Sequence, residues 1–402
     1  MRPELIKEVK YVPYSGNMAA AEAMRQINPD VVAAYPITPQ TELMQFFADF
    51  VANGLVDTEY IPVESEHSAM SACVGAAAAG SRAMTATAGP GLAYMWEVLG
   101  IASGMRLPIV MTVVNRALSA PINIHGDQSD MMGARDQGWI QIFSENAEEQ
   151  YDNLIQAIKI AEDERTRLPV MVGMDGFVIS HAIERVRLLP DRAVEEFIGE
   201  LKPMYPLLDV DNPVTHGPVA MTDSYMEFKR QQREAMMNAY KVIREVGEAF
   251  EEAFGRKYEH IETYKTEDAD YILIIIGSTA GTAKFVIDKL REEKGIKVGL
   301  IKIRTYRPFP YYDVMDAIEA SNCKAVGVFD RAETFGAVGG PLYSDVATAM
   351  YLRNKHYPIV SFIYGLGGRD TNVHHIEEAI DKVMQAAAGK EVPFINYLNL
   401  NE

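Results

Sequence analysis

The sequence predicts an α/β fold with two parallel-sheet domains. Short runs of β-branched and apolar residues alternate with stretches whose apolar residues recur at helical spacing, and this alternation appears twice along the chain. A strand–helix–strand rhythm builds a parallel sheet covered on both faces, so each block predicts one such domain. The 402 residues fit about two to three domains of usual size, and the 48% share of hydrophobic residues is sufficient for their cores.

The first domain is expected over residues 1–200. Its predicted strands and helices alternate along the chain, with strands at 31–35, 83–87, 108–114 and 169–173 and helices at 39–53, 66–79 and 92–105. Helix 66–79 consists mainly of alanine, serine and glycine, whose small side chains let a second backbone or a flat ligand approach closely. A good helix former packed on a sheet explains most of the alanines equally well.

A segment of different character, residues 201–265, is expected to link the two domains. Residues 201–221 are rich in proline and show no periodicity, as in an extended linker. Charges recur at helical spacing through residues 223–258, which predicts one or two long amphipathic helices. Alternation resumes over the second domain, residues 266–402, with strands expected at 271–276, 298–303, 325–329 and 359–363 and helices at 280–293, 311–320, 341–353 and 376–388.

Composition argues against several classes of function. The chain carries 38 Lys and Arg against 56 Asp and Glu, a net charge of −18, without the basic stripe that a nucleic-acid-binding protein needs. No apolar run reaches the length of a membrane span, and the first residues lack the features of a secretory signal, so we expect a cytoplasmic protein. Cys73 and Cys323 are too few for an iron–sulfur cluster or a cysteine-based zinc site, and we expect buried thiols in a reducing compartment.

Nucleotide and metal motifs are weak. Residues 89–91, Gly-Pro-Gly, begin like a dinucleotide-binding fingerprint, but Tyr94 replaces its final small residue and the proline removes one N–H. No P-loop sequence occurs, and Ser278 stands one position early for a nucleophile elbow. His374 and His375 could ligate a metal, but adjacent histidines at a helix start more often face solvent, so we expect no metal site on this chain.

Polar residues follow predicted strands at the edge of the sheet where open α/β proteins bind ligands. After strand 31–35, two prolines fix a turn that holds Thr38, whose hydroxyl either faces the crevice or caps the next helix. Glu66 opens helix 66–79. A carboxylate is stabilised there by the helix dipole, so capping alone could explain it.

A third polar stretch begins with Arg116, directly after strand 108–114. An arginine at a strand exit could hold a carboxylate through two parallel hydrogen bonds. The alternative is an ion pair with Asp127 or Asp130, which follow closely in the sequence. We interpret the patch around these two aspartates as mainly structural.

Long segments in a fixed order carry a resemblance to a known family. The first domain contains YPITPQT, ESEHSAMSACVGAAAAGSRAMTATAGPGLAYMWE, RLPIVMTVVNRALSAPINIHGDQSD and ARDQGW, and the second contains GSTAGTAK, KVGLIKIRTYRPFP, VFDRAETFGAVGGP and YGLGGRD. With these segments the chain resembles the α subunit of the 2-oxoacid:ferredoxin oxidoreductases, in particular the pyruvate:ferredoxin type with separate subunits. The resemblance covers nearly the whole chain.

The resemblance implies an activity and its cofactors. The family decarboxylates a 2-oxoacid oxidatively and reversibly on thiamine diphosphate, with CoA as co-substrate, and passes electrons singly through iron–sulfur clusters to ferredoxin. The first domain is similar to the pyrimidine-binding domain of thiamine enzymes, and the second to the transketolase C-terminal domain, which is usually non-catalytic. Pyruvate is the expected substrate, because Arg116 as the one local cation favours a monocarboxylate with a neutral tail. The open alternatives are 2-oxoisovalerate, an aryl-2-oxoacid or oxalate, a nicotinamide dehydrogenase, and a structural subunit with a decayed pocket.

The resemblance also implies roles for individual residues. Glu66 matches the glutamate that hydrogen-bonds the aminopyrimidine ring, which favours the imino tautomer and turns the exocyclic nitrogen into an internal base. Arg116 and Thr38 match the arginine and threonine that contact the substrate, and a local cation is needed to attract an anion to a chain of net charge −18. Besides Glu66, the residues expected to contact the coenzyme are Pro36, Ile37 and Gly91.

Half of the coenzyme site is missing from the sequence. Thiamine enzymes bind Mg²⁺ and the diphosphate through Gly-Asp-Gly followed by an asparagine, whereas residues 173–176 read GMDG and the next asparagine is Asn212. We therefore expect a β subunit with the Mg²⁺–diphosphate site, and γ/δ or ferredoxin-like subunits with [4Fe–4S] clusters. The expected assembly is a dimer of hetero-oligomers that reduces ferredoxin and contacts neither nucleic acid nor membrane.

Overall fold

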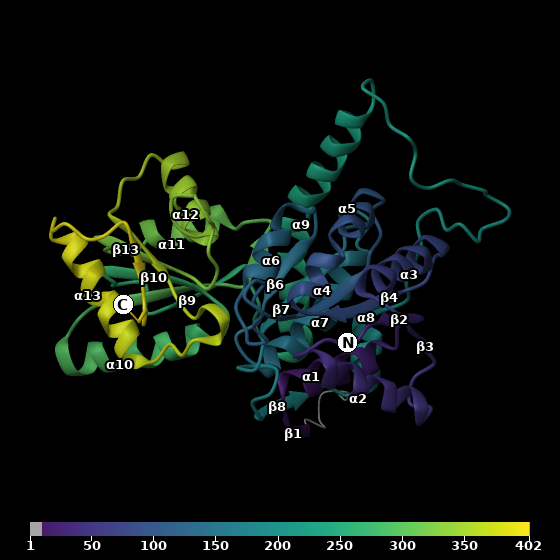
Figure 1. Ribbon diagram of the computed structural model, residues 1–402, viewed down its shortest axis with the longest axis horizontal. Coiled ribbons are helices and arrows are strands. Elements are labelled where there is room, and N and C mark those ends of the chain that lie inside the picture. The colour runs from purple at the N-terminus through teal and green to yellow at the C-terminus, as the bar shows by residue number, and fades with distance from the viewer. Residues whose placement is uncertain (1–9, 402) are drawn as a thin grey trace.

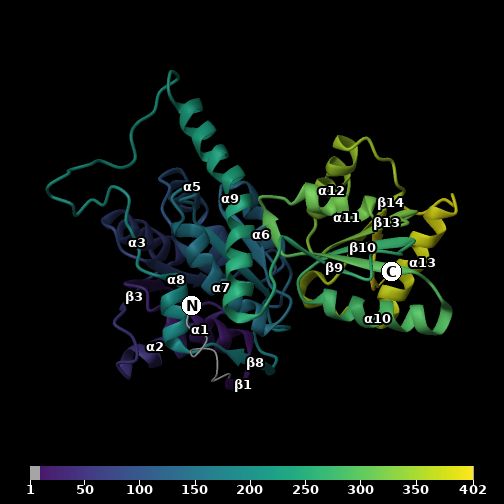
Figure 2. The ribbon, with the colours of Figure 1, turned by 180° about the vertical axis from the view of Figure 1, so that it is seen from behind.

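The structure is a computed structural model that describes residues 10–401. Figure 1 and Figure 2 show two lobes side by side, an N-terminal lobe in purple to teal and a C-terminal lobe in green to yellow. Each lobe is built around a mainly parallel sheet flanked by helices. The expected α/β class with two parallel-sheet domains is confirmed.

Seven strands form the sheet of the N-terminal lobe. They are β2 (Val31–Ala34), β3 (Glu59–Pro62), β4 (Ala83–Thr87), β5 (Val110–Asn115), β6 (Ile140–Phe143), β7 (Val170–Asp175) and β12 (Thr305–Arg307). Their order across the sheet is β12-β6-β7-β5-β4-β2-β3, and every pair is parallel except β12 with β6. The central strands β5 and β7 are buried along their whole length, as expected for strands covered on both faces.

Three strands of this sheet differ from expectation. The sequence does not predict β3 and β6, because a run of four residues contains too little periodicity to recognise. β12 comes from the second half of the chain, yet Thr305 pairs with Ile142 of β6. The C-terminal half of the chain therefore completes the first sheet. A separate antiparallel ribbon joins β1 (Lys10–Tyr14) to β8 (Glu184–Leu188).

Helices cover both faces of the first sheet. One face carries α1 (Gly16–Ile27), α2 (Thr41–Ala52), α7 (Ala147–Glu162) and α8 (Asp191–Ile198), and the other carries α3 (Glu66–Ala79), α4 (Gly89–Tyr94), α5 (Trp96–Gly104) and α6 (Ser129–Gly133). The single helix expected at 92–105 is wrong, since the helix already starts at Gly89 and breaks at Met95. The Met95 N–H is shared between the carbonyls of Gly91 and Leu92, a pattern typical of helix ends.

Residues 201–224 contain only turns and bends, and they lead into a single helix, α9 (Tyr225–Phe254). The C-terminal half of α9 packs on α7 through Ala239, Val242 and Phe250. Its first turns project beyond the lobe together with the preceding residues, drawn in teal in Figure 1. Although α9 has 30 residues, neither it nor any other helix within residues 10–401 combines the length and the apolar composition that a membrane span requires.

Six strands form the sheet of the C-terminal lobe: β9 (Ile261–Tyr264), β10 (Tyr271–Ile276), β11 (Val298–Ile303), β13 (Ala325–Asp330), β14 (Ile359–Ile363) and β15 (Ile395–Tyr397). Their order is β15-β14-β13-β10-β11-β9, and only β9 runs antiparallel to its neighbour. One face carries α10 (Thr279–Lys294) and α13 (Val373–Ala387), and the other α11 (Tyr311–Glu319) and α12 (Pro341–Leu352). β9 lies within residues 201–265, the span expected as linker, so the second sheet draws on residues before 266.

A hydrophobic core is shared by the two lobes at their junction. Phe143, Met171 and, from β12, Tyr306 of the first sheet cluster with residues of the second sheet such as Ile303 at the end of β11. The rings of Phe143 and Tyr306 meet nearly edge to face, with centroids 6.2 Å apart. Such aromatic pairs add to the energy of apolar burial, so the junction resembles a domain interior.

Candidate active site

Glu66 lies in the first turn of α3, just beyond the end of β3. Ser65 is the N-cap residue, and its hydroxyl accepts the Ser68 N–H at 3.2 Å. Capping is therefore supplied by Ser65. The Glu66 side chain is buried, and its carboxylate forms no hydrogen bond within residues 10–401. The positive end of the α3 dipole favours negative charge at this position.

The first turn of α4, directly after β4, is a glycine turn that touches both Glu66 and Arg116. A Cβ added at Gly91 would lie 2.7 Å from Glu66 Oε1 and 2.5 Å from Thr87 Oγ1. A Cβ added at Gly89, whose φ is +44°, would lie 3.0 Å from Arg116 Cβ. Glycine is required at both positions by close approach, and at Gly89 also by the backbone conformation. These contacts explain the Gly-Pro-Gly sequence without a nucleotide.

Arg116 follows β5, and its side chain is buried. Its Nε donates to the Asn123 carbonyl and its Nη1 to the Thr38 carbonyl, both at 3.0 Å. Neither Asp127 nor Asp130 forms an ion pair with it, and within residues 10–401 no carboxylate lies within 4 Å of its guanidinium. Burial lowers the pKa of Arg116, and the nearby Asp130 charge partly offsets this. A buried guanidinium without a carboxylate is a site for an anionic ligand.

Asp130 holds the two turns of the site together. Its carboxylate accepts the N–H groups of Gly89 at 3.0 Å, Arg116 at 2.9 Å and Met131 at 2.7 Å, and Nδ2 of Asn115 at 2.8 Å. Burial raises the pKa of Asp130 to about 6, although these hydrogen bonds act in the opposite direction. These hydrogen bonds are consistent with the interpretation of this patch as structural. Most of them are made to main-chain N–H groups, including those of Gly89 and Arg116 in the site itself.

Gln40 holds the turn after β2 that carries Thr38. Its Oε1 accepts the Ile37 N–H at 3.2 Å, and its Nε2 donates to a carbonyl of β4 at 3.2 Å. Gln40 is also the N-cap residue of α2, so Thr38 does not cap that helix. The Thr38 side chain is exposed, as is Pro36, and Ile37 is half-buried.

The residues predicted for the site are brought together at one edge of the first sheet. Arg116 contacts Thr38 on one side and Gly89 on the other, and two residues further along the same turn Gly91 contacts Glu66. These contacts connect the carboxyl ends of β2, β5 and β4 with the start of α3. The sequence offers no signal for Gln40 and Asn123, which support this arrangement. It singled out Asp130 as a possible ion-pair partner of Arg116, whereas the Asp130 carboxylate accepts the Arg116 backbone N–H.

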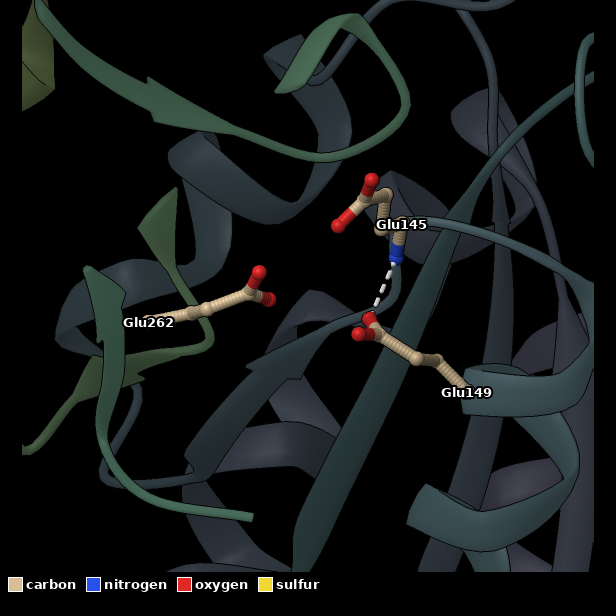
Figure 3. A group of neighbouring side chains, drawn as sticks. All are labelled: Glu145, Glu149 and Glu262. Atoms are coloured by element: carbon tan, nitrogen blue, oxygen red, sulfur yellow. Dashed lines mark hydrogen bonds between the residues drawn. The ribbon is translucent and has the colours of Figure 1, made fainter. Parts of the chain in front are cut away.

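A trio of carboxylates elsewhere in the chain is neutralised by lysines. Figure 3 shows Glu145, Glu149 and Glu262, whose oxygens lie within 4.8 Å of one another. The ammonium of Lys302 lies 2.5–2.6 Å from all three, and Lys284 lies 2.8 Å from Glu145 and 2.7 Å from Glu262. Burial disfavours the charge on Lys302, but the surrounding carboxylates raise its pKa. The lysines stand where a metal ion would bind, so this cluster is a set of ion pairs between the lobes.

Two further sequence candidates have structural roles. Asp175, in the GMDG segment, is buried, lies 3.2 Å from Arg331 of the second lobe, and accepts the N–H of Ser278 at 2.8 Å. It therefore joins the lobes. At the start of α13, Nδ1 of His375 accepts the Asn372 N–H at 3.2 Å within a capping box, which accounts for that histidine.

A carboxylate at a helix start and, within residues 10–401, a guanidinium without a carboxylate partner lie on either side of one glycine turn, an arrangement that fits an α/β coenzyme-binding protein. Comparison with known families agrees. Residues 22–248 match the family described as pyruvate flavodoxin/ferredoxin oxidoreductase, thiamine diphosphate-binding, and residues 269–376 match pyruvate:ferredoxin oxidoreductase core domain II. The chain belongs to the pyruvate:ferredoxin oxidoreductase family, and the expected membership is confirmed.

Curated relatives align along almost their whole length. The chain is 56% identical to pyruvate synthase subunit PorA of Thermotoga maritima over 373 residues, which are 93% of this chain and 94% of that one. It is 50% identical to the PorA subunit of Methanocaldococcus jannaschii over 95% of this chain and 97% of that one. Ketoisovalerate oxidoreductase subunit VorA of Pyrococcus horikoshii is 44% identical over 92% and 94%.

Solved structures share the fold. A 2-oxoglutarate:ferredoxin oxidoreductase from Magnetococcus marinus superposes with a TM-score of 0.69 at 22% identity, covering 95% of this chain and 66% of that one. A split-gene transketolase superposes with a TM-score of 0.56 at 13% identity, covering 94% of this chain and all of that one. At these identities the likeness concerns the fold, which combines a thiamine-diphosphate-binding-like domain with a transketolase C-terminal-like domain.

Proposed function

We propose that this chain is the catalytic α subunit of a multi-subunit pyruvate:ferredoxin oxidoreductase, which converts pyruvate and CoA into acyl-CoA and CO₂ and reduces ferredoxin. One observation carries the proposal. A buried, unpaired Arg116 and the carboxylate of Glu66 lie on the two sides of one glycine turn. Identities of 50–56% to pyruvate synthase subunits over more than nine-tenths of the chain support the same activity.

The residues at this edge fit the aminopyrimidine end of thiamine diphosphate. The Glu66 carboxylate is free of hydrogen bonds within residues 10–401, and glycine at position 91 lets the main chain approach it closely, since a Cβ there would lie 2.7 Å from Oε1. When bound, thiamine diphosphate supplies the carbanion and the electron sink that decarboxylation of a 2-oxoacid requires. Glu66 shares a proton with a pyrimidine ring nitrogen, and Pro36, Ile37 and Gly91 contact the ring.

Arg116 and Thr38 bind the substrate in this proposal. Two backbone carbonyls fix the guanidinium plane of Arg116, so its remaining N–H groups, including Nη2, are available to the carboxylate of the 2-oxoacid. The exposed hydroxyl of Thr38 donates a hydrogen bond to the bound oxoacid. A single cation favours pyruvate over a dicarboxylate. The second candidate is 2-oxoisovalerate, because ketoisovalerate oxidoreductase subunits are 43–44% identical to this chain.

We also propose that partner subunits complete the enzyme. A β subunit supplies the Mg²⁺–diphosphate half of the site, and γ/δ or ferredoxin-like subunits carry [4Fe–4S] clusters to ferredoxin, in a dimer of hetero-oligomers. The engagement of Asp175 with Arg331 supports this division, because the GMDG carboxylate is already used. Large apolar side chains are exposed on the same segments as the site residues, as on a surface that a partner covers: Tyr35, Tyr94, Trp96, Leu118, Ile122 and Ile124.

A cytoplasmic location completes the proposal. Cys73 and Cys323 are unpaired, and burial raises the pKa of both thiols to about 12. Cys73 is buried as expected, whereas Cys323 is only half-buried. Thiols that stay protonated and unpaired are compatible with a reducing compartment, where disulfides are rare.

The native assembly tests these proposals. Purified from its source, it is assayed with pyruvate, 2-oxoisovalerate, an aryl-2-oxoacid, oxalate and 2-oxoglutarate, and its iron, sulfide and thiamine contents are measured. We expect the highest kcat/KM with pyruvate, and a preference for 2-oxoglutarate or oxalate would contradict the substrate assignment. The chain purified alone should oxidise no 2-oxoacid. Turnover by the isolated chain would refute the partner proposal.

A further inference from the structure

The loop that follows Arg116 is fastened to the second lobe at one glycine. Nδ2 of Asn123 donates to the Gly367 carbonyl at 2.9 Å, and the Gly367 N–H donates to Oδ2 of Asp127 at 3.0 Å. Both backbone polar groups of Gly367 are therefore engaged by a single loop of the first lobe. Gly367 belongs to a short 3₁₀ turn, Leu366–Gly368, that follows β14.

Asn123 connects this fastening to the guanidinium. Its backbone carbonyl accepts Nε of Arg116 at 3.0 Å, and its Oδ1 accepts the His125 N–H at 2.7 Å. The side chain thus grips the second lobe while the main chain of the same residue orients Arg116. Only one other hydrogen bond holds the guanidinium within residues 10–401, the one to the Thr38 carbonyl.

The base of the loop is closed by the Ala117 N–H, which donates to the His125 carbonyl at 3.0 Å, but the tip has few such contacts. Residues 118–122 are exposed, and Ile122 is 78% exposed. A segment with few buried apolar contacts opens at low free energy unless other contacts restrain it. Asn123 and Asp127 supply such restraint by bonding to Gly367 of the second lobe, and at the end of the loop the Gln128 N–H donates to the Arg331 carbonyl at 2.8 Å.

Gly367 admits no other residue without disturbing Asn123. Its φ is +59°, in the left-handed region, and a Cβ there would overlap the Asn123 amide. An alanine at this position must displace the Asn123 side-chain amide from the Gly367 carbonyl. The main chain of Asn123, whose carbonyl orients Nε of Arg116, then loses its restraint from the second lobe.

We propose that the Leu366–Gly368 turn of the second lobe positions the substrate-binding arginine through Asn123, so the second lobe takes part in substrate recognition without touching the substrate. The inference rests on the proposed role of Arg116. In this arrangement Gly367 and Asn123 are positioning residues. Removing their contact weakens substrate binding and leaves the bond-making groups in place.

The test compares variants of the complete assembly. Gly367→Ala should raise KM for pyruvate about tenfold and change kcat little, as expected when a hydrogen bond to a charged group that aids ground-state binding is lost. Asn123→Ala removes the same contact without backbone strain and should act in the same direction. The matched control is Gly389→Ala, which has a similar φ of +73° but open space around the added Cβ. It should leave KM unchanged.

Hydrogen–deuterium exchange supplies a readout independent of turnover. Amides of residues 117–126 should exchange faster in Gly367→Ala and Asn123→Ala than in wild type or Gly389→Ala. Arg116→Ala distinguishes failure of the proposed substrate-binding role of Arg116 from failure of the proposed positioning role of Gly367 and Asn123. If it leaves KM unchanged, the proposed function fails and the inference with it. If Arg116→Ala raises KM while Gly367→Ala and Asn123→Ala alter neither KM nor exchange, the inference alone is overturned.

Discussion

Gly91 is the position where a single added methyl group should disable the site. In Gly91→Ala the new Cβ would lie 2.7 Å from Glu66 Oε1 and 2.9 Å from Glu66 Cγ. Ordinary contact begins near 3.4 Å, so the carboxylate has to move by about 0.7 Å (3.4 minus 2.7) or swing to another rotamer. Thr87 Oγ1, at 2.5 Å, blocks the methyl on its other side. Because misplacing a catalytic group by about 1 Å can cost about 100-fold, we expect kcat to fall between about 10- and 100-fold.

The assay is pyruvate-dependent reduction of ferredoxin by the complete assembly, with saturating CoA and thiamine diphosphate. Gly104→Ala is the matched control, because an added Cβ at Gly104 would meet nothing within 4 Å. Glu66→Gln is the reference variant. It keeps the shape but not the proton-sharing role, and should lower kcat about 100-fold or more, in the range of a lost acid–base contribution.

A double variant tests whether the two positions act through one group. If Gly91 matters only because it leaves room for Glu66, adding Gly91→Ala to the Glu66→Gln variant should lower kcat little further. Such non-additivity is typical of residues that act as one unit. Multiplicative losses would show that Gly91 acts on something else. A Gly91→Ala enzyme with kcat within about twofold of wild type would refute the reasoning, because the steric conflict would then have no consequence for the reaction.

Three further predictions concern single positions. Arg116→Lys keeps the charge but loses the planar set of donors, so KM for pyruvate should rise about tenfold in steady-state assays, and an unchanged KM would contradict a role in carboxylate binding. Burial raises the pKa of Asp130 to about 6. With a pKa near 4 in the unfolded chain, the native state binds more protons between these values, so the contribution of Asp130 to the unfolding free energy falls by about 3 kcal/mol as pH rises through that window. Asp130→Asn lacks this titration. Urea denaturation at pH 4 and pH 7 should therefore show that the unfolding free energy of wild type falls relative to that of the variant at the higher pH. The same change in both proteins would contradict the raised pKa of Asp130. Lys302→Met leaves the three carboxylates with Lys284 as their one remaining partner in the cluster and should lower the unfolding free energy by about 3 kcal/mol. An unchanged urea midpoint would show that the ion pairs of Lys302 contribute nothing.

Strands could be predicted from the sequence where a buried strand coincides with one continuous, mainly apolar run. β4, β10, β11 and β14 match their expected ranges because each is an apolar run bounded by polar residues. β3, β6 and β15 have three or four residues, too few for a pattern to appear. β12 could not be placed from the sequence, because its pairing with β6 joins positions more than 150 residues apart, Thr305 and Ile142. Local patterns contain no information about such a partner.

The site could be predicted in part. Strand ends and the family resemblance select Glu66, Arg116 and Thr38, and the structure brings them into one line of contacts while their roles stay a prediction. Asp130 and Asn123 could not be selected, since each acts through hydrogen bonds to main-chain groups distant in sequence. The sequence does not show from which N–H groups a buried aspartate accepts hydrogen bonds.

The strand order shows from which side a partner can reach the coenzyme. The second lobe contacts the first sheet at the ends of β7 and β5, where Asp175 meets Arg331 and the loop after Arg116 meets Gly367. Glu66 lies on the other side of β5 in the strand order, at the start of α3 and against Gly91, which follows β4. The second lobe therefore closes one flank of the site and leaves the other open, where exposed Tyr35, Tyr94 and Trp96 project. We therefore expect the proposed β subunit to approach over this flank, and substituting these aromatic residues by charged ones should weaken assembly before it affects the folding of the chain.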